Sequence, residues 1–411
     1  MKVEVMDAIC GSGKTVGIIK WMIENPNKRY LYISPMLTEV EERIPEECSA
    51  LEFVFPSDER STKSEHLLEL LKEHRNISFT HSLFSSLTLE HLRLIKELGY
   101  TLIVDEEFGL IEPYSGKYKK GDIVSLEKQN LIKVDEDNLG RVEWLWDDMD
   151  NNTQYTELQR LCSTDMLYCS KRDRDMMVIQ LPMALVGSAE RTIILTYLFS
   201  GSVMESFLKL KGVDVLPFTE VELLKDTEEV LARSRELITI CNTTSTNSIK
   251  SLSLSSSWYS NNANTKELNR VSNAIRSVIR KHGNEVILLT APKDSVERFK
   301  GNTKTKNARC VSPRNMIIDE VFLYCGARAT NDYAHKSVAI HAYNRFTNLV
   351  VKSYLQDYGK DINAVPDDDK FALAEMIQWI WRTQIREDKP IELYILSGRM
   401  EKIFKAWLDG K

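Results

Sequence analysis

The sequence lacks long apolar runs and the cysteine patterns of a disulfide or zinc framework. No segment reaches the roughly 18 consecutive apolar residues of a membrane-spanning helix, and the opening MKVEVMDAIC leaves no room for a signal peptide. The seven cysteines are scattered and odd in number, and the one close pair, Cys162 and Cys169, lacks zinc-ligand spacing. We therefore expect a cytoplasmic chain with reduced thiols and no membrane partner.

Positive charge is not in excess. The chain carries 54 Lys and Arg against 60 Asp and Glu, which gives a net charge of −6. This excludes a uniformly basic nucleic-acid binder but not a local basic cleft, because the field of the cleft is what attracts a polyanion. A hydrophobic share of 43% excludes a disordered or collagen-like chain. A length of 411 residues predicts two or three domains.

Apolar strand-like runs alternate with helical segments in both halves, which is typical of an α/β fold with parallel sheets. The pattern predicts, among others, helices at 38–43 and 347–358 and strands at 320–324 and 338–341. The rhythm breaks from about 110 to 190, a polar stretch with charge clusters such as KRDRD at 171–175. We interpret this stretch as an accessory insertion in the first domain, more simply a surface elaboration than a specific device. The predicted domains are 1–225 and 226–411.

Residues 8–15, AICGSGKT, fit the relaxed Walker A pattern between a predicted strand and a predicted helix at 14–24. Gly11 and Gly13, on either side of Ser12, allow backbone conformations that turn successive N–H groups toward phosphate. Lys14 is expected to reach the β- and γ-phosphates, and the Thr15 hydroxyl to ligate Mg²⁺. The segment predicts a nucleotide-binding loop.

An acidic cluster follows the apolar strand at 101–104. Asp105, Glu106 and Glu107 would lie at the carboxyl edge of a parallel sheet, where the phosphate loop also lies. We expect Asp105 to hold Mg²⁺ and Glu106 to polarise the attacking water. Glu107 is more simply a solvated loop carboxylate. Together with the loop, the cluster predicts nucleotide hydrolysis.

A polar stripe stands near the C-terminus in a helix predicted over 368–386. Gln378, Arg382 and Arg386 recur every four residues and would share one face of that helix. Two arginines and a glutamine suit a surface that meets phosphate, although a solvated stripe is also open.

This stripe resembles motif VI of superfamily 2 helicases, in which two arginines of the second RecA-like domain reach the γ-phosphate. The resemblance leaves open whether Arg386 or Arg382 is the arginine finger. Other segments resemble the remaining motifs in order. Leu195-Thr196-Tyr197 stands at motif III, and the expected nucleic-acid contacts are Ser34, Pro35, Thr80, His81, Thr290, Thr330 and Asn331.

The resemblance spans nearly the whole chain except the insertion and is greatest to small DEAD-like helicases encoded by bacteriophages. It implies two RecA-like P-loop NTPase domains that hydrolyse ATP with Mg²⁺ at their interface. It also implies a helicase or translocase acting on single-stranded or forked nucleic acid, DNA rather than RNA, in phage DNA replication or recombination within the host cytoplasm.

Three alternatives stay open from the residues alone. A nucleotide-gated nucleic-acid-binding ATPase would hydrolyse ATP without unwinding. A phage DNA-packaging motor would need a nuclease carboxylate cluster, for which Asp367-Asp368-Asp369 is the dense candidate. A small-molecule kinase would use the same phosphate loop, but it would not explain why the second half has its own strand–helix alternation ending in an arginine stripe. In the insertion, Trp144 and Trp146 could stack on bases or, more simply, pack in a core.

Overall fold

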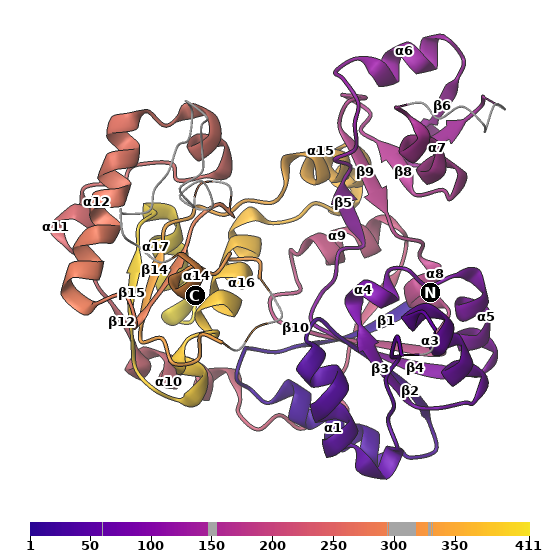
Figure 1. Ribbon diagram of the computed structural model, residues 1–411, viewed down its shortest axis with the longest axis horizontal. Coiled ribbons are helices and arrows are strands. Elements are labelled where there is room, and N and C mark those ends of the chain that lie inside the picture. The colour runs from indigo at the N-terminus through magenta and orange to yellow at the C-terminus, as the bar shows by residue number, and fades with distance from the viewer. Residues whose placement is uncertain (60, 147–153, 294, 296–317, 328–329, 331) are drawn as a thin grey trace. The chain divides into compact units, whose positions relative to one another are not determined.

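The structure is a computed structural model that describes all residues except 60, 147–153, 294, 296–317, 328–329 and 331 (Figure 1). The chain forms two compact units. Unit 1 comprises Met1–Ala8, Lys14–Glu222 and Thr347–Asp367, and unit 2 comprises Ile9–Gly13, Leu223–Phe346 and Asp368–Lys411. Within the described residues, no helix is long and apolar enough to cross a bilayer, and the cysteines are free thiols.

Unit 1 is built on a six-stranded sheet whose pairings are all parallel. Its central strands are mainly apolar and, apart from one end residue each, buried on both faces, as is typical of parallel strands covered by helices. The predicted parallel-sheet α/β fold is confirmed here. In sheet order, the strands are β11 (Asp214–Pro217), β1 (Lys2–Asp7), β10 (Arg191–Thr196), β4 (Tyr100–Asp105), β2 (Arg29–Ser34) and β3 (Ile77–Thr80).

Helices surround the sheet of unit 1, and some begin at polar capping residues. Thr62 and Glu65 form a capping box at the start of α3, which satisfies backbone donors there. The helix predicted at 38–43 takes a wider π-helical form over Glu39–Arg43. The α-helices are α1 (Lys14–Glu24), α2 (Ile44–Glu47), α3 (Lys63–Lys72), α4 (His81–Phe84), α5 (Leu89–Glu97), α8 (Ala184–Gly187) and α9 (Val203–Leu210).

The predicted insertion folds as a small antiparallel domain, here called the middle module (residues 111–180). Its sheet has the order β5 (Ile111–Pro113), β9 (Met177–Gln180), β8 (Leu167–Cys169), β7 (Arg141–Trp144) and β6 (Ile132–Asp135), with helices α6 (Asp122–Lys128) and α7 (Thr156–Ser163). It has its own apolar core, against which Trp144 packs. The rings of Trp144 and Trp146 stack with centroids 6.2 Å apart.

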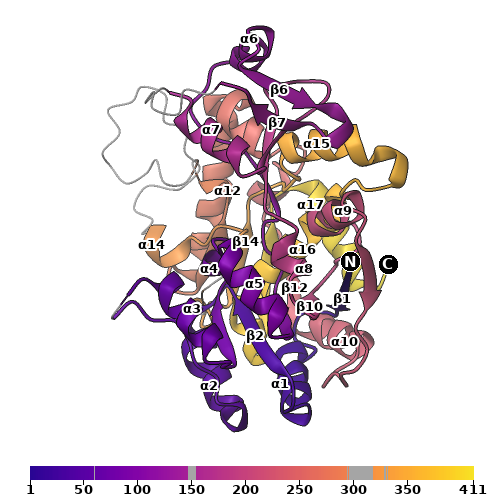
Figure 2. The same cartoon turned by 90° about the vertical axis from the view of Figure 1, so that its right-hand side faces the viewer.

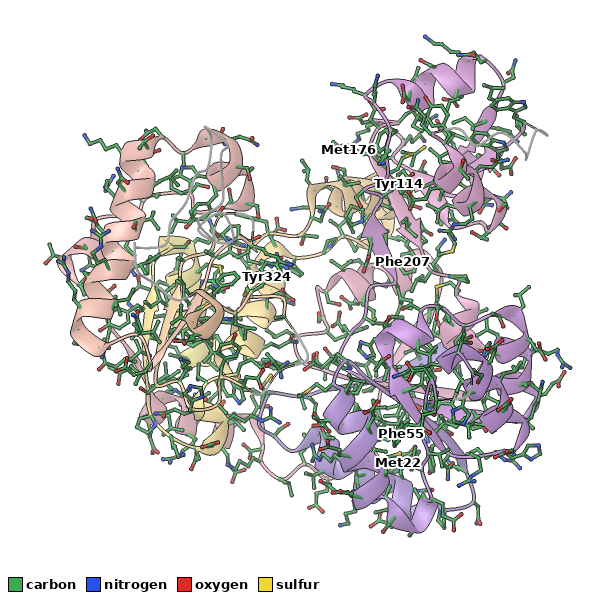
Figure 3. The ribbon with its side chains drawn as sticks, viewed as in Figure 1. Met22, Phe55, Tyr114, Met176, Phe207 and Tyr324 are labelled. Carbon is green, nitrogen blue, oxygen red and sulfur yellow. The ribbon has the colours of Figure 1, made fainter. Side chains whose placement is uncertain are left out.

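One helix from the second half of the sequence belongs to unit 1. The helix α15 (Leu349–Gly359) packs against α9 and against β5 and β9 of the middle module (Figures 1 and 2). Tyr354 and Leu355 of α15 lie in the same core as Phe207 of α9, which Figure 3 labels. The predicted second domain, 226–411, is therefore wrong for residues 347–367, because their apolar side chains are buried in unit 1.

Unit 2 is built on a four-stranded parallel sheet. Its strands, in sheet order, are β12 (Ile238–Ile240), β15 (Ile391–Ile395), β14 (Val338–His341) and β13 (Ile287–Thr290). Its helices are α10 (Thr227–Leu237), α11 (Thr244–Asn247), α12 (Thr265–His282), α14 (Ile318–Val321), α16 (Asp368–Ile380) and α17 (Gly398–Leu408). A strand expected at 320–324 is reduced to one bridge between Phe322 and Leu289.

The helix α16, predicted over 368–386, is shorter than predicted. It ends at Ile380 rather than Arg386, because the backbone N–H groups of Arg382 and Thr383 bond three residues back, to Trp379 and Ile380. The Thr383 hydroxyl also donates to the Ile380 carbonyl at 2.7 Å. This side chain competes for a helical carbonyl and the backbone then becomes extended at Thr383.

Candidate nucleotide site

The phosphate loop and the acidic cluster begin at the same edge of the unit 1 sheet. The end of β1 and the end of β4 both pair with β10. The ladder continues past the strands, because Ala8 N donates to Thr196 O at 3.0 Å and Glu106 N donates to Leu195 O at 2.9 Å. Two strand spacings, about 10 Å, therefore separate the two segments. A magnesium nucleotide can span that distance.

The loop itself has the backbone conformations that the motif requires. Gly11 and Gly13 have φ angles of +86° and +90°, in the region that favours glycine. The N–H and the hydroxyl of Ser12 both donate to Ile9 O, at 3.2 and 2.8 Å. Lys14 Nζ donates to Ala8 O at 2.5 Å, which holds the ammonium over the loop. Thr15 follows in the first turn of α1 and is partly exposed.

Asp105 is held by a buried tyrosine. Tyr32 on β2 is fully buried, and its hydroxyl donates to Asp105 Oδ2 at 2.9 Å. Burial, and next the charge of Glu106, raise the pKa of Asp105 to about 7, while the Tyr32 hydrogen bond and Lys14 act in the opposite direction. Tyr32 is a candidate positioning residue that our sequence reasoning missed. The signal was present, since strand alternation and register place Tyr32, Ile103 and Asp105 on one face.

The donor set fits a divalent cation of the hard, oxygen-binding type. Asp105 supplies a desolvated carboxylate, and Thr15 supplies a hydroxyl next to the loop. A cation beside Asp105 would favour the ionised form that burial disfavours. Among the described residues, including those of this site, no group of three or more His, Cys, Asp or Glu side chains is placed to hold a metal ion without other ligands.

The other two carboxylates sit in a strained, bonded turn. Glu106 has a φ of +64°, unusual for a residue with a side chain. Glu107 Oε1 accepts a hydrogen bond of 3.1 Å from the hydroxyl of Thr196. Glu107 is thus bonded rather than simply solvated, and it links the acidic cluster directly to the segment at the end of β10.

The two expected backbone-contacting loops of unit 1 carry mainly structural side chains. Ser34 is buried, and its Oγ accepts from Met36 N at 3.3 Å, while Pro35 is half-buried. Thr80 Oγ1 accepts from Leu83 N at 3.4 Å and caps α4. The His81 ring lies 5.7 Å from that of Phe108. Both loops follow the carboxyl ends of strands, β2 and β3.

Of the three contacts expected in the second half of the sequence, the structure describes two, and both lie in unit 2. Thr290 ends β13 and is fully buried, paired in register with His341. Thr330 is half-buried, and its hydroxyl donates to Asp332 Oδ2 at 2.8 Å. The third, Asn331, lies outside the described residues. The buried side chain of Thr290 does not present a polar group to solvent.

The predicted stripe of Gln378, Arg382 and Arg386 is not one helical face. Gln378 lies in α16 and is half-buried, whereas Arg382 lies in the turn after the helix and is 7% exposed. Arg386 lies in a short 3₁₀ helix, Gln384–Glu387, and is exposed. The prediction of a common face is wrong because the helix stops at Ile380.

Comparison with solved structures shows the class of fold. The chain is similar to a solved structure of apo XPD, with a TM-score of 0.54 and 14% identity, covering 100% of this chain and 95% of the other. It also resembles Xpd4 of S. tokodaii, with a TM-score of 0.48 and 10% identity, covering 99% and 94%. The similarity to apo XPD, together with the parallel sheets of units 1 and 2, confirms the predicted fold with RecA-like parallel sheets.

Sequence comparisons point to a prophage relative. The chain is 28% identical over 436 residues to the SPbeta prophage-derived uncharacterized protein YonV of Bacillus subtilis (strain 168), covering 100% of this chain and 99% of YonV. Residues 232–408 match the family described as the YonV C-terminal Rossmann-like domain, and residues 111–178 match the YonV middle domain. The second match coincides with the middle module.

Proposed function

We propose that this protein is a nucleic-acid-dependent ATPase that moves along or unwinds nucleic acid, most simply single-stranded or forked DNA in phage replication or recombination. The observation that carries the proposal is the placement of the Lys14 loop and the Asp105–Glu106 turn at one edge of a parallel sheet. The helicase-like fold and the prophage relative support the nucleic-acid substrate and the phage setting.

The residues divide the chemistry among them. Lys14 and the N–H groups of the loop bind the phosphates. Thr15 and Asp105 hold Mg²⁺, which when bound neutralises phosphate charge. Glu106 orients and polarises the attacking water. Arg382 and Arg386 are proposed to supply the charge that stabilises the transition state from the second RecA-like domain.

Thr196 offers a path from the nucleotide to the nucleic acid. It lies where the helicase resemblance places motif III, and its hydroxyl bonds Glu107, directly after the proposed water-positioning Glu106. A change at the acidic turn would reach the end of β10 through one hydrogen bond. This contact favours a motor over an ATPase in which hydrolysis is not transmitted.

The alternative of a packaging motor with a nuclease half loses its best feature. Asp368 and Asp369 begin α16, where carboxylates are favourable, and Asp369 pairs with Arg399 at 2.6 Å. These contacts give the acidic run a structural role. Cleavage of plasmid DNA in the presence of Mg²⁺ or Mn²⁺ would reinstate the nuclease alternative.

The proposal is tested by ATP hydrolysis with and without single-stranded DNA. We expect stimulation by DNA in the wild type and none in Lys14→Ala. Lys20→Ala is a matched control, because Lys20 is exposed on the same helix and, among the residues that the structure describes, makes only a 3.9 Å ion pair with Glu24. Equal rates with and without DNA would refute coupling. ATP consumption that leaves DNA and RNA duplexes with either overhang intact would instead identify a nucleotide-gated binding protein.

A further inference from the structure

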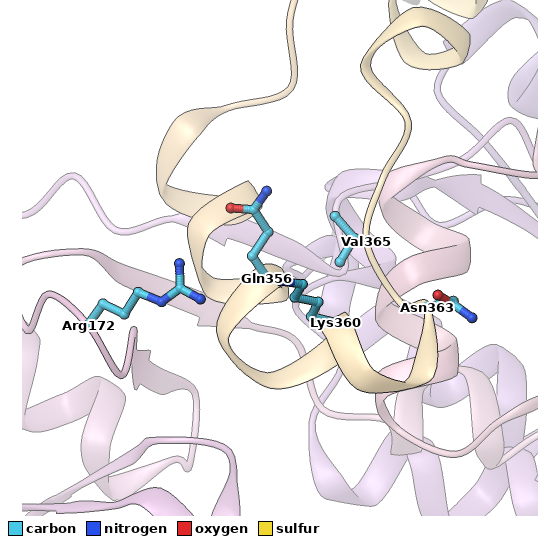
Figure 4. Close-up of a pocket in the computed structure, with 5 residues that line it drawn as sticks. All are labelled: Arg172, Gln356, Lys360, Asn363 and Val365. Carbon is cyan, nitrogen blue, oxygen red and sulfur yellow. The ribbon is translucent and has the colours of Figure 1, made fainter.

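An open groove lies where the middle module meets α15. It has a volume of about 410 Å³ and is lined by Arg172, Gln356, Lys360, Asn363 and Val365 (Figure 4). Arg172 comes from the loop between β8 and β9, and the other four come from α15 and the short turn after it. All of these residues belong to unit 1. None of the elements that carry the proposed ATP chemistry contributes to this groove.

The arginine of the groove is held in place by a buried carboxylate. Asp357 has a side chain only 1% exposed, and its Oδ1 lies 2.8 Å from Arg172 Nε. Its Oδ2 accepts from Arg172 N at 3.1 Å and from the hydroxyl of Ser170. The Arg172 side chain is nevertheless 70% exposed. Asp357 therefore fixes the guanidinium through Nε and leaves its two terminal nitrogens as donors.

The opposite wall is also fixed and carries unmatched donors. Asn363 N donates to Lys360 O at 3.1 Å, and Ala364 N donates to Gly359 O at 2.8 Å, so the turn after α15 is closed by its own backbone. The exposed Lys360 has no ion pair among the described residues. Gln356 and Asn363 add two side-chain amides. The lining thus has two cations, two amides and no carboxylate.

We infer that this groove binds the phosphodiester backbone of the single strand on which the protein acts, and this inference rests on the proposed function. A planar guanidinium and an ammonium are the usual partners of phosphate. The lining contains no aromatic side chain on which a base could stack. The groove therefore contacts the backbone independently of sequence, and a strand bound there touches both the middle module and α15.

The test compares binding of a fluorescent oligothymidylate by full-length variants between 50 and 200 mM salt. Lys360→Gln removes one cation without disturbing Asp357, and Arg172→Gln removes the other. Lys96→Gln is the matched control, because Lys96 is exposed on α5 and makes no ion pair among the described residues. Each single-strand phosphate contact contributes about 0.7 to the slope of log affinity against log salt.

We expect the slope to fall by about 0.7 in each groove variant and by about 1.4 in the double variant. The wild-type advantage over the double variant should then shrink about sevenfold between 50 and 200 mM salt. ATP turnover without DNA should match that of the wild type. Groove variants that bind the oligonucleotide like Lys96→Gln would refute strand binding in the groove while leaving the proposed function intact. A wild type that neither binds the oligonucleotide nor hydrolyses ATP faster with it would overturn both.

Discussion

Removing one buried hydroxyl should weaken the proposed magnesium site without removing a proposed ligand. In Tyr32→Phe, Asp105 Oδ2 loses its 2.9 Å hydrogen bond from the hydroxyl of Tyr32, a fully buried side chain. A hydrogen bond to a charged group contributes about 1.5–3 kcal/mol, and the loss of a residue that orients a metal ligand typically costs about 10- to 100-fold in metal affinity or activity. We therefore expect ATP turnover at limiting Mg²⁺ to fall about 10- to 100-fold.

The assay is steady-state ATP hydrolysis over a range of free Mg²⁺ concentrations. The half-saturating Mg²⁺ concentration should rise in Tyr32→Phe, and high Mg²⁺ should restore part of the lost turnover. Tyr30→Phe is the matched control, because Tyr30 lies on the same strand, is equally buried, and donates its hydroxyl to Asn25 O at 2.9 Å instead of to the site. Identical Mg²⁺ curves for the two variants, within about twofold, would refute the positioning role.

Three further predictions concern other parts of the chain. Arg386→Ala should lower DNA-stimulated turnover about 10³-fold or more at an unchanged melting temperature. Arg382→Ala should also lower the melting temperature, because Arg382 is buried. An active Arg386→Ala variant would assign the arginine finger to Arg382. Burial and, as the second cause, the charge of Arg345 lower the pKa of His341 to about 3. The unfolded chain therefore binds this proton more tightly, and the free energy of unfolding should fall by about 2 kcal/mol between pH 8 and pH 5. Urea titrations of His341→Leu should show a smaller fall than those of the wild type, and equal falls would contradict this. Tyr354→Ala should cost about 3–5 kcal/mol and speed proteolysis of the middle module, while unchanged cleavage would show that α15 does not hold it.

Local patterns were sufficient for the first RecA-like sheet. The strand before the phosphate loop, the helix after it and the strand that ends at Asp105 lie where the sequence predicts them. Each is specified within a dozen residues, by alternation, by glycines or by an unbroken apolar run. The same holds for β14, predicted and observed over residues 338–341.

Features that depend on distant residues were not predictable in this way. A helix was expected at 347–358 and is present, but nothing in its sequence says which core buries Tyr354. The end of α16 depends on the hydroxyl of Thr383, which competes with the helical pattern around it. The bond from Tyr32 to Asp105 joins residues 73 positions apart, and it becomes visible only once the strand register is known.

The place of α15 sets an order for biosynthesis. Unit 1 cannot complete its core until residues 347–367 have left the ribosome, about 145 residues after Glu222. At about 5–20 residues per second, this delay is roughly 7–30 s. During that interval the apolar faces of α9 and β9 that α15 will cover are exposed to aggregation or to a chaperone. The two halves of the gene are therefore poor candidates for separate expression, since the first would lack its last helix and the second would display it unburied.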